Sequence, residues 1–495
     1  MLTSKSFIPS FGMLAGISRL ALGLALGASP SCAFDDVRVA GAADSTDESV
    51  TSAELSADDL ASEAICTKGR FRCHARVQTT KEGVRITSHA AATAPKGFGP
   101  PDLQSAYNIT DATKTVTATP TVAIIDAYGY AAIESDLAAY RSNYGLPACT
   151  IASGCLKVVN QDGAVSPLPL DPPPDDDWTI ETALDMDMVS ALCPTCKILV
   201  VQANDNSGNG LLFGQATAVS LGATVISDSW GGPEAAPPND PADAEQFFDQ
   251  PGVAIFVSAG DAGYNDQFST NGTGPDYPGT SAHVISVGGT HLVKDTSTRG
   301  WHETTWAPVA GSARSGAGGS ACSLSIPKPA YQTASPCAFK ATTDIAAVGD
   351  PATGLAVYNA ANGGWITLGG TSASAPMVAA IFAATGNGAQ TSGSFIASNA
   401  SKLNDVTSGN NGTCGTTTLL CNAAVGWDGP TGFGTPNAAA LSPAPTTSGS
   451  DSGTGGDTGS GSTDVTGGCS AGSGAGAGLW LGVVLVGLVR RRRAR

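Results

Sequence analysis

One glycine-bounded segment, Gly369-Gly-Thr-Ser-Ala-Ser-Ala-Pro376, holds a candidate nucleophile, Ser372. A helix is expected over residues 377–385, so this serine is predicted to stand at a turn that leads into a helix. At such a place the hydroxyl is exposed and backbone N–H groups can stabilise a developing oxyanion. For any single serine, a helix cap is the commoner explanation. The chemistry expected of Ser372 is acyl transfer, which needs a base and an oxyanion donor elsewhere in the chain.

Two carboxylates are spaced as a candidate base and its partner. Glu181 and Asp185, in Trp178-Thr-Ile-Glu-Thr-Ala-Leu-Asp185, lie one turn apart on one face of a helix expected over residues 178–192. Two carboxylates this close repel when both are ionised, so the pKa of one rises and the pair can share a proton. Acidic pairs at this spacing are usually a solvated helix face, but the apolar residues around this pair disfavour a fully wet face.

A third carboxylate follows an expected strand. Asp261 stands in a glycine-bounded turn, Val257-Ser-Ala-Gly-Asp-Ala-Gly263. Active sites of open α/β folds gather at the carboxyl edge of the sheet, where such turns lie. A protonated Asp261 can donate a hydrogen bond to an oxyanion, whereas the plain alternative is an aspartate that only stabilises its turn.

The elements that must position these residues alternate along the chain. Short, nearly continuous apolar runs are typical of strands buried on both faces of a parallel sheet. Helices are expected between them, over residues 178–192 and 210–221, and this order predicts an α/β fold. The predicted strands cover residues 121–125, 197–201, 223–227, 253–257 and 284–287.

Composition excludes several classes of protein. Of the 495 residues 42% are hydrophobic and 14% charged, which is too apolar for a disordered chain. The 62 glycines and 30 prolines are too many for a helical bundle or coiled coil. A net charge of −17 argues against nucleic acid as a partner, because a basic surface would supply most of that affinity.

Twelve cysteines indicate an oxidising compartment. Without Cys32 and Cys469, near the two ends, ten remain as five neighbouring pairs that suggest local disulfides, although the sequence alone leaves the connectivity open. Cys193-Pro-Thr-Cys196 is also compatible with a redox or zinc motif, but no second such motif and no nearby histidine complete a metal site. The pairs are 66 and 73, 149 and 155, 193 and 196, 322 and 337, and 414 and 421.

The N-terminal region is predicted to direct export. Residues 1–33 combine basic residues, a short apolar run and small residues at Ser31 and Ala33, as in a secretory signal peptide. Cys32 as a lipid-attachment site is the less favoured alternative. Residues 34–97 are predicted to be a short acidic leader or pro-segment, and residues 98–441 the folded domain.

The C-terminal region predicts a linker and a membrane stop. Residues 442–468 are rich in Gly, Ser and Thr and are expected to be flexible. Residues 469–495 contain Cys469, an apolar span long enough to cross a bilayer, and an arginine cluster. This tail resembles the sorting tails of myxobacterial-type surface proteins, which implies processing near Cys469 and a mature protein at the cell surface or released. A permanent single-pass anchor is the alternative.

Taken in order, the three candidate segments resemble those of the sedolisin, or serine-carboxyl peptidase, family. The resemblance runs from Gly97-Phe-Gly-Pro-Pro-Asp-Leu-Gln-Ser-Ala-Tyr107 to Gly432-Phe-Gly-Thr-Pro-Asn437. It implies a subtilisin-like three-layer fold with a mostly parallel central sheet flanked by helices. By the same resemblance Ser372 is the nucleophile, Glu181 the base, Asp185 the carboxylate that orients it, and Asp261 the oxyanion donor.

The histidines separate this family from the subtilisins. A subtilisin-type enzyme needs a histidine base soon after the first strand, and no histidine lies between residues 90 and 282. Asp126, at the end of the first expected strand, does stand where subtilisins keep their triad aspartate. A glutamate base, with an ordinary pKa near ~4.3 against ~6.5 for histidine, stays ionised in acid, so activity at acidic pH is expected.

The resemblance also implies binding residues. Ser229, Trp230 and Gly231 are expected to line the substrate cleft, although a turn at a strand end is the plain reading. One structural Ca²⁺ is expected, with oxygen ligands as a hard cation requires. Its implied ligands are the carboxylates of Asp405 and Asp428 and the backbone carbonyls of Val406, Ala424 and Gly426. Ala424 replaces the family's usual glycine.

The function expected from the sequence is an exported endopeptidase that acts on proteins or peptides in acid, as a monomer. Exopeptidase action that releases tripeptides is an alternative, and a catalytically silent surface binding protein is a less favoured one. One departure from the family bears on activation. Sedolisins usually carry a long folded pro-domain, whereas only about 64 residues separate the expected signal peptide from the resemblance.

Overall fold

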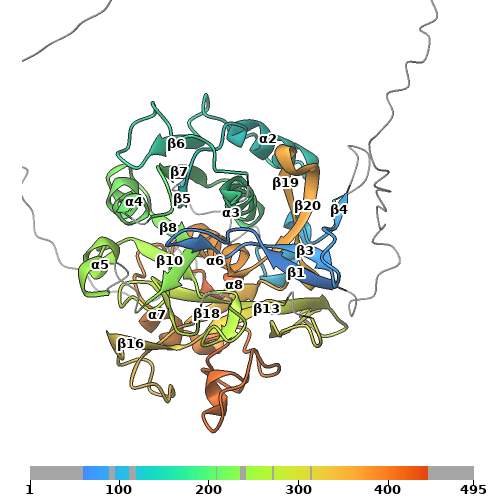
Figure 1. Ribbon diagram of the computed structural model, residues 1–495, viewed down its shortest axis with the longest axis vertical. Coiled ribbons are helices and arrows are strands. Elements are labelled where there is room, and N and C mark those ends of the chain that lie inside the picture. Colours follow the sequence, from blue (N-terminus) through green and yellow to red (C-terminus); the bar gives the residue numbers. More distant parts are fainter. Residues whose placement is uncertain are drawn as a thin grey trace, which may run out of the picture. The chain divides into compact units, whose positions relative to one another are not determined.

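A mostly parallel sheet of eight strands forms the centre of the structure (Figure 1). This computed structural model describes residues 60–88, 95–110, 119–174, 176–207, 209–234, 241–269, 272–312 and 315–443. The predicted signal peptide, the tail and nearly all of the linker lie outside these residues, and the predicted domain boundaries stay predictions. No helix among the described residues is both long and apolar enough to cross a membrane.

The strands of this sheet follow the order β14-β13-β10-β8-β5-β7-β6, and β18 also pairs with β13. All of these pairs are parallel except β13 with β14. The five predicted strands are confirmed as β5, β7, β8, β10 and β13. The bounds are β5 Thr121–Ala127, β6 Leu156–Asn160, β7 Lys197–Ala203, β8 Val225–Asp228, β10 Ala254–Ser258, β13 Ile285–Lys294, β14 Trp301–Thr305 and β18 Ile345–Val348.

Helices cover both faces of the sheet, as the α/β prediction requires. The two predicted helices are confirmed as α3 (Trp178–Leu192) and α4 (Asn209–Ser220). Helix α4 packs on β5 and β7, whereas α3 packs on β5 and on α6 (Thr371–Ala384), which also contacts β8, β10, β13 and β18. In Figure 1, α3 and α4 lie on opposite sides of β5 and β7. All fifteen residues of α3 are buried, so its carboxylates are held away from solvent.

The remaining elements surround this centre. Three short strands form a separate small sheet in the order β12-β9-β2, which adjoins the site described below. The helices are α1 Pro100–Ala106, α2 Ile133–Asn143, α5 Pro241–Phe248, α7 Gly393–Ser398 and α8 Ala438–Leu441. The strands are β2 Arg72–Cys73, β9 Trp230–Pro233, β11 Ala262–Tyr264, β12 Asp276–Tyr277, β15 Ala317–Ser320, β16 Cys322–Pro327 and β17 Phe339–Ala341.

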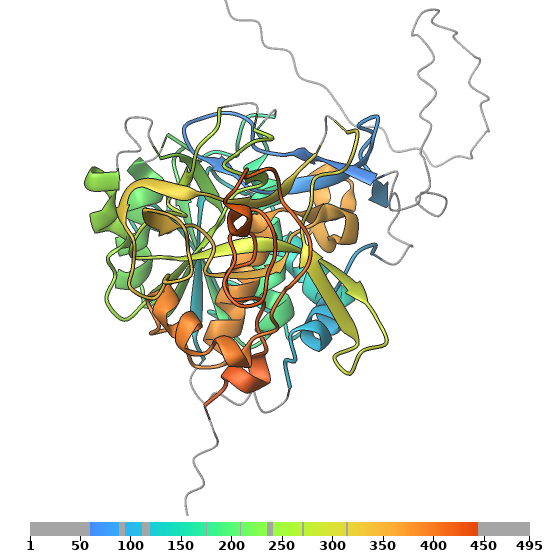
Figure 2. The ribbon, with the colours of Figure 1, turned by 90° about the horizontal axis from the view of Figure 1, so that it is seen from below.

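The expected leader contains strands that the sequence did not predict. Strands β1 (Leu60–Ala64), β3 (Arg76–Thr80) and β4 (Thr87–Ser88) join β19 (Leu355–Asn359) and β20 (Gly364–Gly369) in a five-stranded sheet. Figure 2 shows the early strands, in blue, together along one edge of the domain. Strands β3 and β4 of the leader pair with β20, and β20 leads directly into α6. Backbone hydrogen bonds therefore hold the leader next to the segment that carries Ser372.

All five predicted disulfides are confirmed. The pair Cys193 and Cys196 is one of them, which agrees with a structural role. Each bridge joins residues no more than 15 positions apart. The disulfides therefore close local loops rather than linking distant parts of the chain.

Aromatic packing under α6 supports the fold beneath the site. The rings of Phe256 on β10 and Phe382 on α6 meet edge to face, with centroids 4.8 Å apart, and both are fully buried. Phe382→Ala is expected to lower the free energy of unfolding by about 3–5 kcal/mol, because it removes contacts and leaves a cavity. The same change at Phe339, which is 40% exposed, should cost within about 0.5 kcal/mol. Urea denaturation checks both values, and equal losses would contradict the packing described.

Candidate active site

Ser372 lies in the first turn of α6, which begins at Thr371, six residues earlier than predicted. The prediction started the helix after Pro376 because proline has no N–H to donate inside a helix. Here that missing donor leaves the carbonyl of Ser372 free, and this carbonyl accepts a hydrogen bond from the Ser229 hydroxyl at 3.2 Å. The hydrogen bond from Ser229 to this free carbonyl thus connects the start of α6 with the segment that follows β8.

The hydroxyl of Ser372 is fully buried and donates to the carbonyl of Ser229 at 3.0 Å. Gly370, just before the helix, has φ +102°, a backbone conformation that favours glycine. A Cβ at Gly370 would lie only 1.8 Å from the carbonyl oxygen of His74. Glycine is therefore needed here both for its backbone conformation and for the close approach of the leader.

The two predicted carboxylates of α3 face a third, Asp126, at the end of β5. Glu181, Asp185 and Asp126 are all fully buried. Burial raises the pKa of Glu181 well above its usual value, and the charge of Asp126 adds to this, while the nearby Ser372 hydroxyl lowers it. Neither Glu181 oxygen has a hydrogen-bond partner of regular geometry within the part of the chain that the structure describes. The Ser372 hydroxyl and the Glu181 carboxyl are thus neighbours, but they form no hydrogen bond of regular geometry with each other in this state.

The proton sharing predicted for this pair extends to all three carboxyls. Burial raises the pKa of Asp185 well above its usual value, with the charges of Asp126 and Glu181 as the next causes. Burial also raises the pKa of Asp126, to about 7. Oδ1 of Asp185 lies 2.8 Å from the Ser229 hydroxyl, whose single proton is shared between Asp185 and the carbonyl of Ser372. Three carboxyls in one buried cluster cannot all be ionised, so the cluster holds protons at neutral pH.

Asp261 follows β10 and reaches the start of α6. Its Oδ1 accepts from the backbone N–H and the hydroxyl of Thr371, at 2.7 and 2.8 Å, while its Oδ2 has no partner among the described residues. Burial raises the pKa of Asp261, and the positive charges of His74 and Arg76 lower it. The unpartnered oxygen can therefore carry a proton beside the backbone N–H of Ser372.

The leader crosses this site as an extended peptide. Strand β2 pairs antiparallel with β9, opposing Arg72 to Gly231 and Cys73 to Trp230. The N–H of His74 donates to the carbonyl of Ser229 at 3.1 Å, and the carbonyl of His74 accepts from the N–H of Ser372 at 3.4 Å. Peptide ligands commonly add a strand to an exposed edge in this way. His74 is thus the residue whose carbonyl points at the candidate nucleophile's own N–H.

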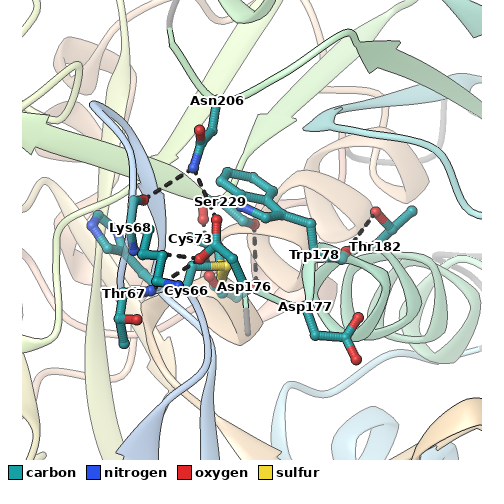
Figure 3. The surroundings of a disulfide bond; sticks show 12 residues. Cys66, Thr67, Lys68, Cys73, Asp176, Asp177, Trp178, Thr182, Asn206 and Ser229 are labelled. Carbon is teal, nitrogen blue, oxygen red and sulfur yellow. Dashed lines mark hydrogen bonds between the residues drawn. A yellow bond between two sulfur atoms is a disulfide. The ribbon is translucent and has the colours of Figure 1, made fainter. Parts of the chain in front are cut away.

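A disulfide in the leader covers the base. The sulfurs of Cys66 and Cys73 and a carboxylate oxygen of Glu181 lie within 4.8 Å of one another. Asp176 holds the loop by accepting from the N–H of Thr67 and from the amide of Asn206, both at 3.1 Å (Figure 3). Sequence reasoning missed this arrangement. The signal available was a cysteine pair inside an otherwise acidic leader.

The structure brings all the predicted catalytic residues, Ser372, Glu181, Asp185 and Asp261, to one place, with Ser229, Trp230 and Gly231 beside them. Among the described residues, His74 is the histidine at this place, and its ring contacts Ser258 and Asp276.

The loops that carry Asp405 and Asp428 contact each other elsewhere on the domain. Asp405 accepts from the N–H of Gly426 and Asp428 from that of Ala424, both at 2.9 Å, so the two loops are in contact. Burial raises the pKa of Asp428 to about 7, and the charge of Asp405 contributes. Carboxylate oxygens are ligands that Ca²⁺ prefers, and a cation would offset the repulsion between Asp405 and Asp428.

Comparisons with known proteins agree with this geometry. Residues 176–424 match the model of the subtilase family. The chain is 31% identical to kumamolisin of a Bacillus species over 393 residues, which cover 75% of this chain and 67% of kumamolisin. It is 28% identical to sedolisin of a Pseudomonas species, covering 71% of this chain and 62% of the relative. The match thus spans about two thirds of the length of these relatives.

A solved structure shows the same fold. Pseudomonas sedolisin, described as a serine-carboxyl proteinase in complex with two molecules of pseudo-iodotyrostatin, superposes with a TM-score of 0.58 at 27% identity. The superposition covers 70% of this chain and 98% of that structure. The predicted subtilisin-like fold is confirmed by this match together with the mostly parallel sheet. The chain belongs to the subtilase family and, within it, groups with the sedolisin-type serine peptidases.

Proposed function

We propose that this chain is an exported serine-carboxyl endopeptidase that cleaves peptide bonds at acidic pH through an acyl-enzyme on Ser372. The observation that carries the proposal is that the N–H of Ser372 donates to the carbonyl of an extended peptide at His74, while Glu181 lies beside Ser372 and Asp261 binds the preceding residue, Thr371. The five disulfides support export, because such bonds persist in oxidising compartments. A cell-surface or extracellular destination remains part of the proposal.

The proposed mechanism assigns one task to each side chain. Glu181 takes the proton of Ser372 as its oxygen attacks the substrate carbonyl, and Asp185 positions Glu181. The resulting oxyanion is held by the N–H of Ser372 and by a proton on Oδ2 of Asp261. Glu181 then returns the proton to the leaving amine, and water releases the acyl group by the same steps in reverse order.

These tasks limit the working pH. Glu181 acts only when ionised and Asp261 only when protonated, so activity requires a pH above the pKa of the base and below that of Asp261. Burial raises the pKa of Asp261, which extends this range upward. Under the leader, burial also raises the pKa of Glu181, so the covered site holds a protonated base. Loss of the leader admits water and should lower that pKa.

The length of the covered cleft supports endopeptidase action. Besides His74, Cys73 and Arg72, the cleft holds a fourth residue, Phe71, whose buried ring packs on Trp230 at 4.9 Å. The N–H of Phe71 also donates to the carbonyl of Asn206. A tripeptidyl-peptidase of Aspergillus fumigatus is 30% identical over 236 residues, covering 38% of this chain and 35% of the relative. An enzyme that releases tripeptides needs a cleft closed after three residues, and this one continues.

The product masses distinguish these activities. Purified protein without its leader, given a denatured protein substrate between about pH 3 and 8, should yield internal fragments with most cleavage in acid. Products confined to tripeptides would replace the endopeptidase with an exopeptidase. Absence of cleavage by folded, calcium-supplied protein would favour the silent binding protein.

The part of the leader that ends at His74 is proposed to be a pro-segment that the enzyme removes from itself. Full-length protein incubated between about pH 4 and 8 is expected to be cut after His74, because that carbonyl already faces the N–H of Ser372. The cut should be slow at first, because burial under the leader keeps most of the Glu181 base protonated. Mass spectrometry of the fragments checks the position of the cut. Ser372→Ala protein should remain intact under the same conditions, and its cleavage at this bond would assign the cut to another enzyme.

One structural Ca²⁺ is proposed to bind Asp405, Asp428 and the carbonyls of Val406, Ala424 and Gly426. Without the ion, Asp428 has a folded pKa of about 7, above the ~3.9 of an unfolded chain. The folded state then binds the extra proton, so stability should fall as pH rises from about 4 to about 7. Calcium at about 100 times its Kd should add about 2.7 kcal/mol at neutral pH and less in acid.

Thermal unfolding with calcium or with a chelator, at pH 4 and pH 7, tests this site. Asp428→Asn should remove the response to calcium at both pH values. Asp162→Asn, at an exposed turn far along the chain from these loops, should keep it. A calcium response that survives Asp428→Asn would place the ion elsewhere.

A further inference from the structure

The side chain of His74 occupies a polar pocket beside the proposed nucleophile. Its Nδ1 lies 2.7 Å from the hydroxyl of Ser258, and its Nε2 lies 3.3 Å from Oδ2 of Asp276. A Cβ at Gly231 would come within 2.9 Å of the imidazole, so glycine leaves the room that this ring uses. The pocket is thus matched to the side chain of His74 in size and in its hydrogen-bonding groups.

Asp276 gives this imidazole an acidic partner. Its carboxylate faces Nε2 at 3.3 Å, while the Ser258 hydroxyl, 2.7 Å from Nδ1, can accept a hydrogen bond from that nitrogen or donate one to it. A protonated ring gains an ion pair with the Asp276 carboxylate, so the pocket attracts a cation.

A second acidic group lies in the same cavity. Asp266 and Asp276 both line the cavity around the leader, and both lie above Gly260, where a Cβ would stand 3.9 and 3.0 Å from their oxygens. Burial and the charge of Asp276 raise the pKa of Asp266 to about 9, while the charge of Arg72 lowers it. A carboxyl with so high a pKa is protonated in acid, so Asp266 contributes a polar group to the pocket and the attraction for a cation falls to Asp276.

The register of the leader places a second basic residue, Arg72, on the same side as Asp266 and Asp276. Alternate residues of a strand face the same side, so Arg72 lies on the side of His74, two positions before it. Strand β12, which carries Asp276, pairs with β9 on the edge opposite β2. The small sheet thus holds an acidic strand on one side of β9 and a basic peptide on the other.

We infer that this pocket makes the enzyme specific for peptides with a cationic side chain, histidine or a similar basic residue, immediately before the cleaved bond, and that it favours a second basic residue two positions earlier. The inference rests on the proposed peptidase function and adds the substrate class. Asp276 is the main specificity-determining residue, and Asp266 assists it. The leader fits the cleft because its Arg72 and His74 meet this preference.

The test compares matched peptides. A fluorogenic decapeptide with the sequence of residues 69–78, in which serine replaces Cys73, is offered to full-length protein that has released its leader in acid. A second peptide carries glutamine in place of His74. A hydrogen bond between charged groups is expected to make kcat/KM about 10- to 100-fold higher for the histidine peptide. Asp276→Asn should bring the histidine peptide close to the glutamine peptide.

A matched control tests whether the effect depends on the carboxylate in the cleft rather than on the loss of any carboxylate beside a histidine. Asp249→Asn removes a carboxylate that also lies beside a histidine, 3.5 Å from His283, but outside the cleft. It should leave the ratio between the two peptides unchanged. Equal kcat/KM for both peptides with the unaltered enzyme, or an unchanged ratio in Asp276→Asn, would overturn the specificity while leaving the peptidase function standing.

A measurement without catalysis separates the two failures. In full-length Ser372→Ala protein the leader stays covalently attached, and hydrogen exchange of residues 72–80 reports how firmly it is seated. Adding His74→Gln or Asp276→Asn should speed this exchange about 10-fold or more, whereas Asp249→Asn should not. If neither peptide is cut, the proposed peptidase function fails. If hydrogen exchange of residues 72–80 is then unchanged in both His74→Gln and Asp276→Asn, the proposed specificity pocket is rejected as well. If exchange is faster in these variants, the pocket stands as a binding site for the leader.

Discussion

Glu181→Gln and Ser372→Ala are each expected to lower kcat by about four to six orders of magnitude, the range found when one member of a nucleophile and base pair is removed. Glutamine keeps the shape of Glu181 but cannot take the proton of Ser372. Because the two groups act as a unit, the double variant should lose little more than either single one. Initial rates with a fluorogenic peptide in acid measure all three.

Matched control variants distinguish a loss of catalysis from a loss of the fold. Ser374→Ala removes a buried hydroxyl of the same helix, which donates to the carbonyl of Ala347 at 3.0 Å, away from the site. Asp187→Asn changes a buried carboxyl of α3 that accepts from the N–H of Tyr358. Both should keep most of the activity. Comparable loss in either control, with the fold intact, would move the assignment away from Ser372 and Glu181.

Asp261→Ala should lower kcat about 10²- to 10³-fold, the cost of losing one oxyanion donor. Asp261→Asn should retain more activity and change its dependence on pH. The wild-type carboxyl donates only below its pKa, which burial raises, so wild-type activity falls as pH rises through that value. Asparagine donates a hydrogen bond at every pH, so the fall of activity at high pH should disappear in Asp261→Asn or move to a higher pH.

Complete profiles of kcat against pH measure this difference. Asp136→Ala, which truncates a buried carboxyl bound to the hydroxyl of Tyr130 at 2.6 Å, controls for the loss of a buried hydrogen bond. It should leave the shape of the profile unchanged. If Asp261→Asn reproduced the wild-type alkaline decline, the group that titrates there would be a different one.

The sequence predicted the central sheet and the site residues because their signals are local. Runs such as residues 121–125 and 197–201 are apolar throughout, as strands covered on both faces must be. Helix α3 has the predicted bounds, and its residue Glu181 lies beside Ser372. Neighbouring cysteines pair with each other, so their spacing was informative.

The leader and the specificity pocket were not predictable in this way. Strand β3 is partly polar, and its partner β20 follows almost 300 residues later, so no local pattern indicates the pairing. Asp266 and Asp276 lie in or beside loops, and their proximity to His74 depends on how β9, β12 and β2 assemble. The early start of α6 was missed because the lost bond at Pro376 is compensated by Ser229, a distant residue.

The position of the Cys66–Cys73 bridge bears on how long the enzyme stays inhibited. Both cysteines precede His74, so a cut after His74 separates the looped segment from β3, which remains paired with β20. Before the cut the blocking peptide is part of the same chain, at an effective concentration on the order of millimolar. Afterwards it is held only by non-covalent contacts, among them the pairing of β1 with β3, and once it dissociates it dilutes into the surroundings. Activation would therefore be one-way in dilute medium, and partly reversible where many copies are crowded on one surface.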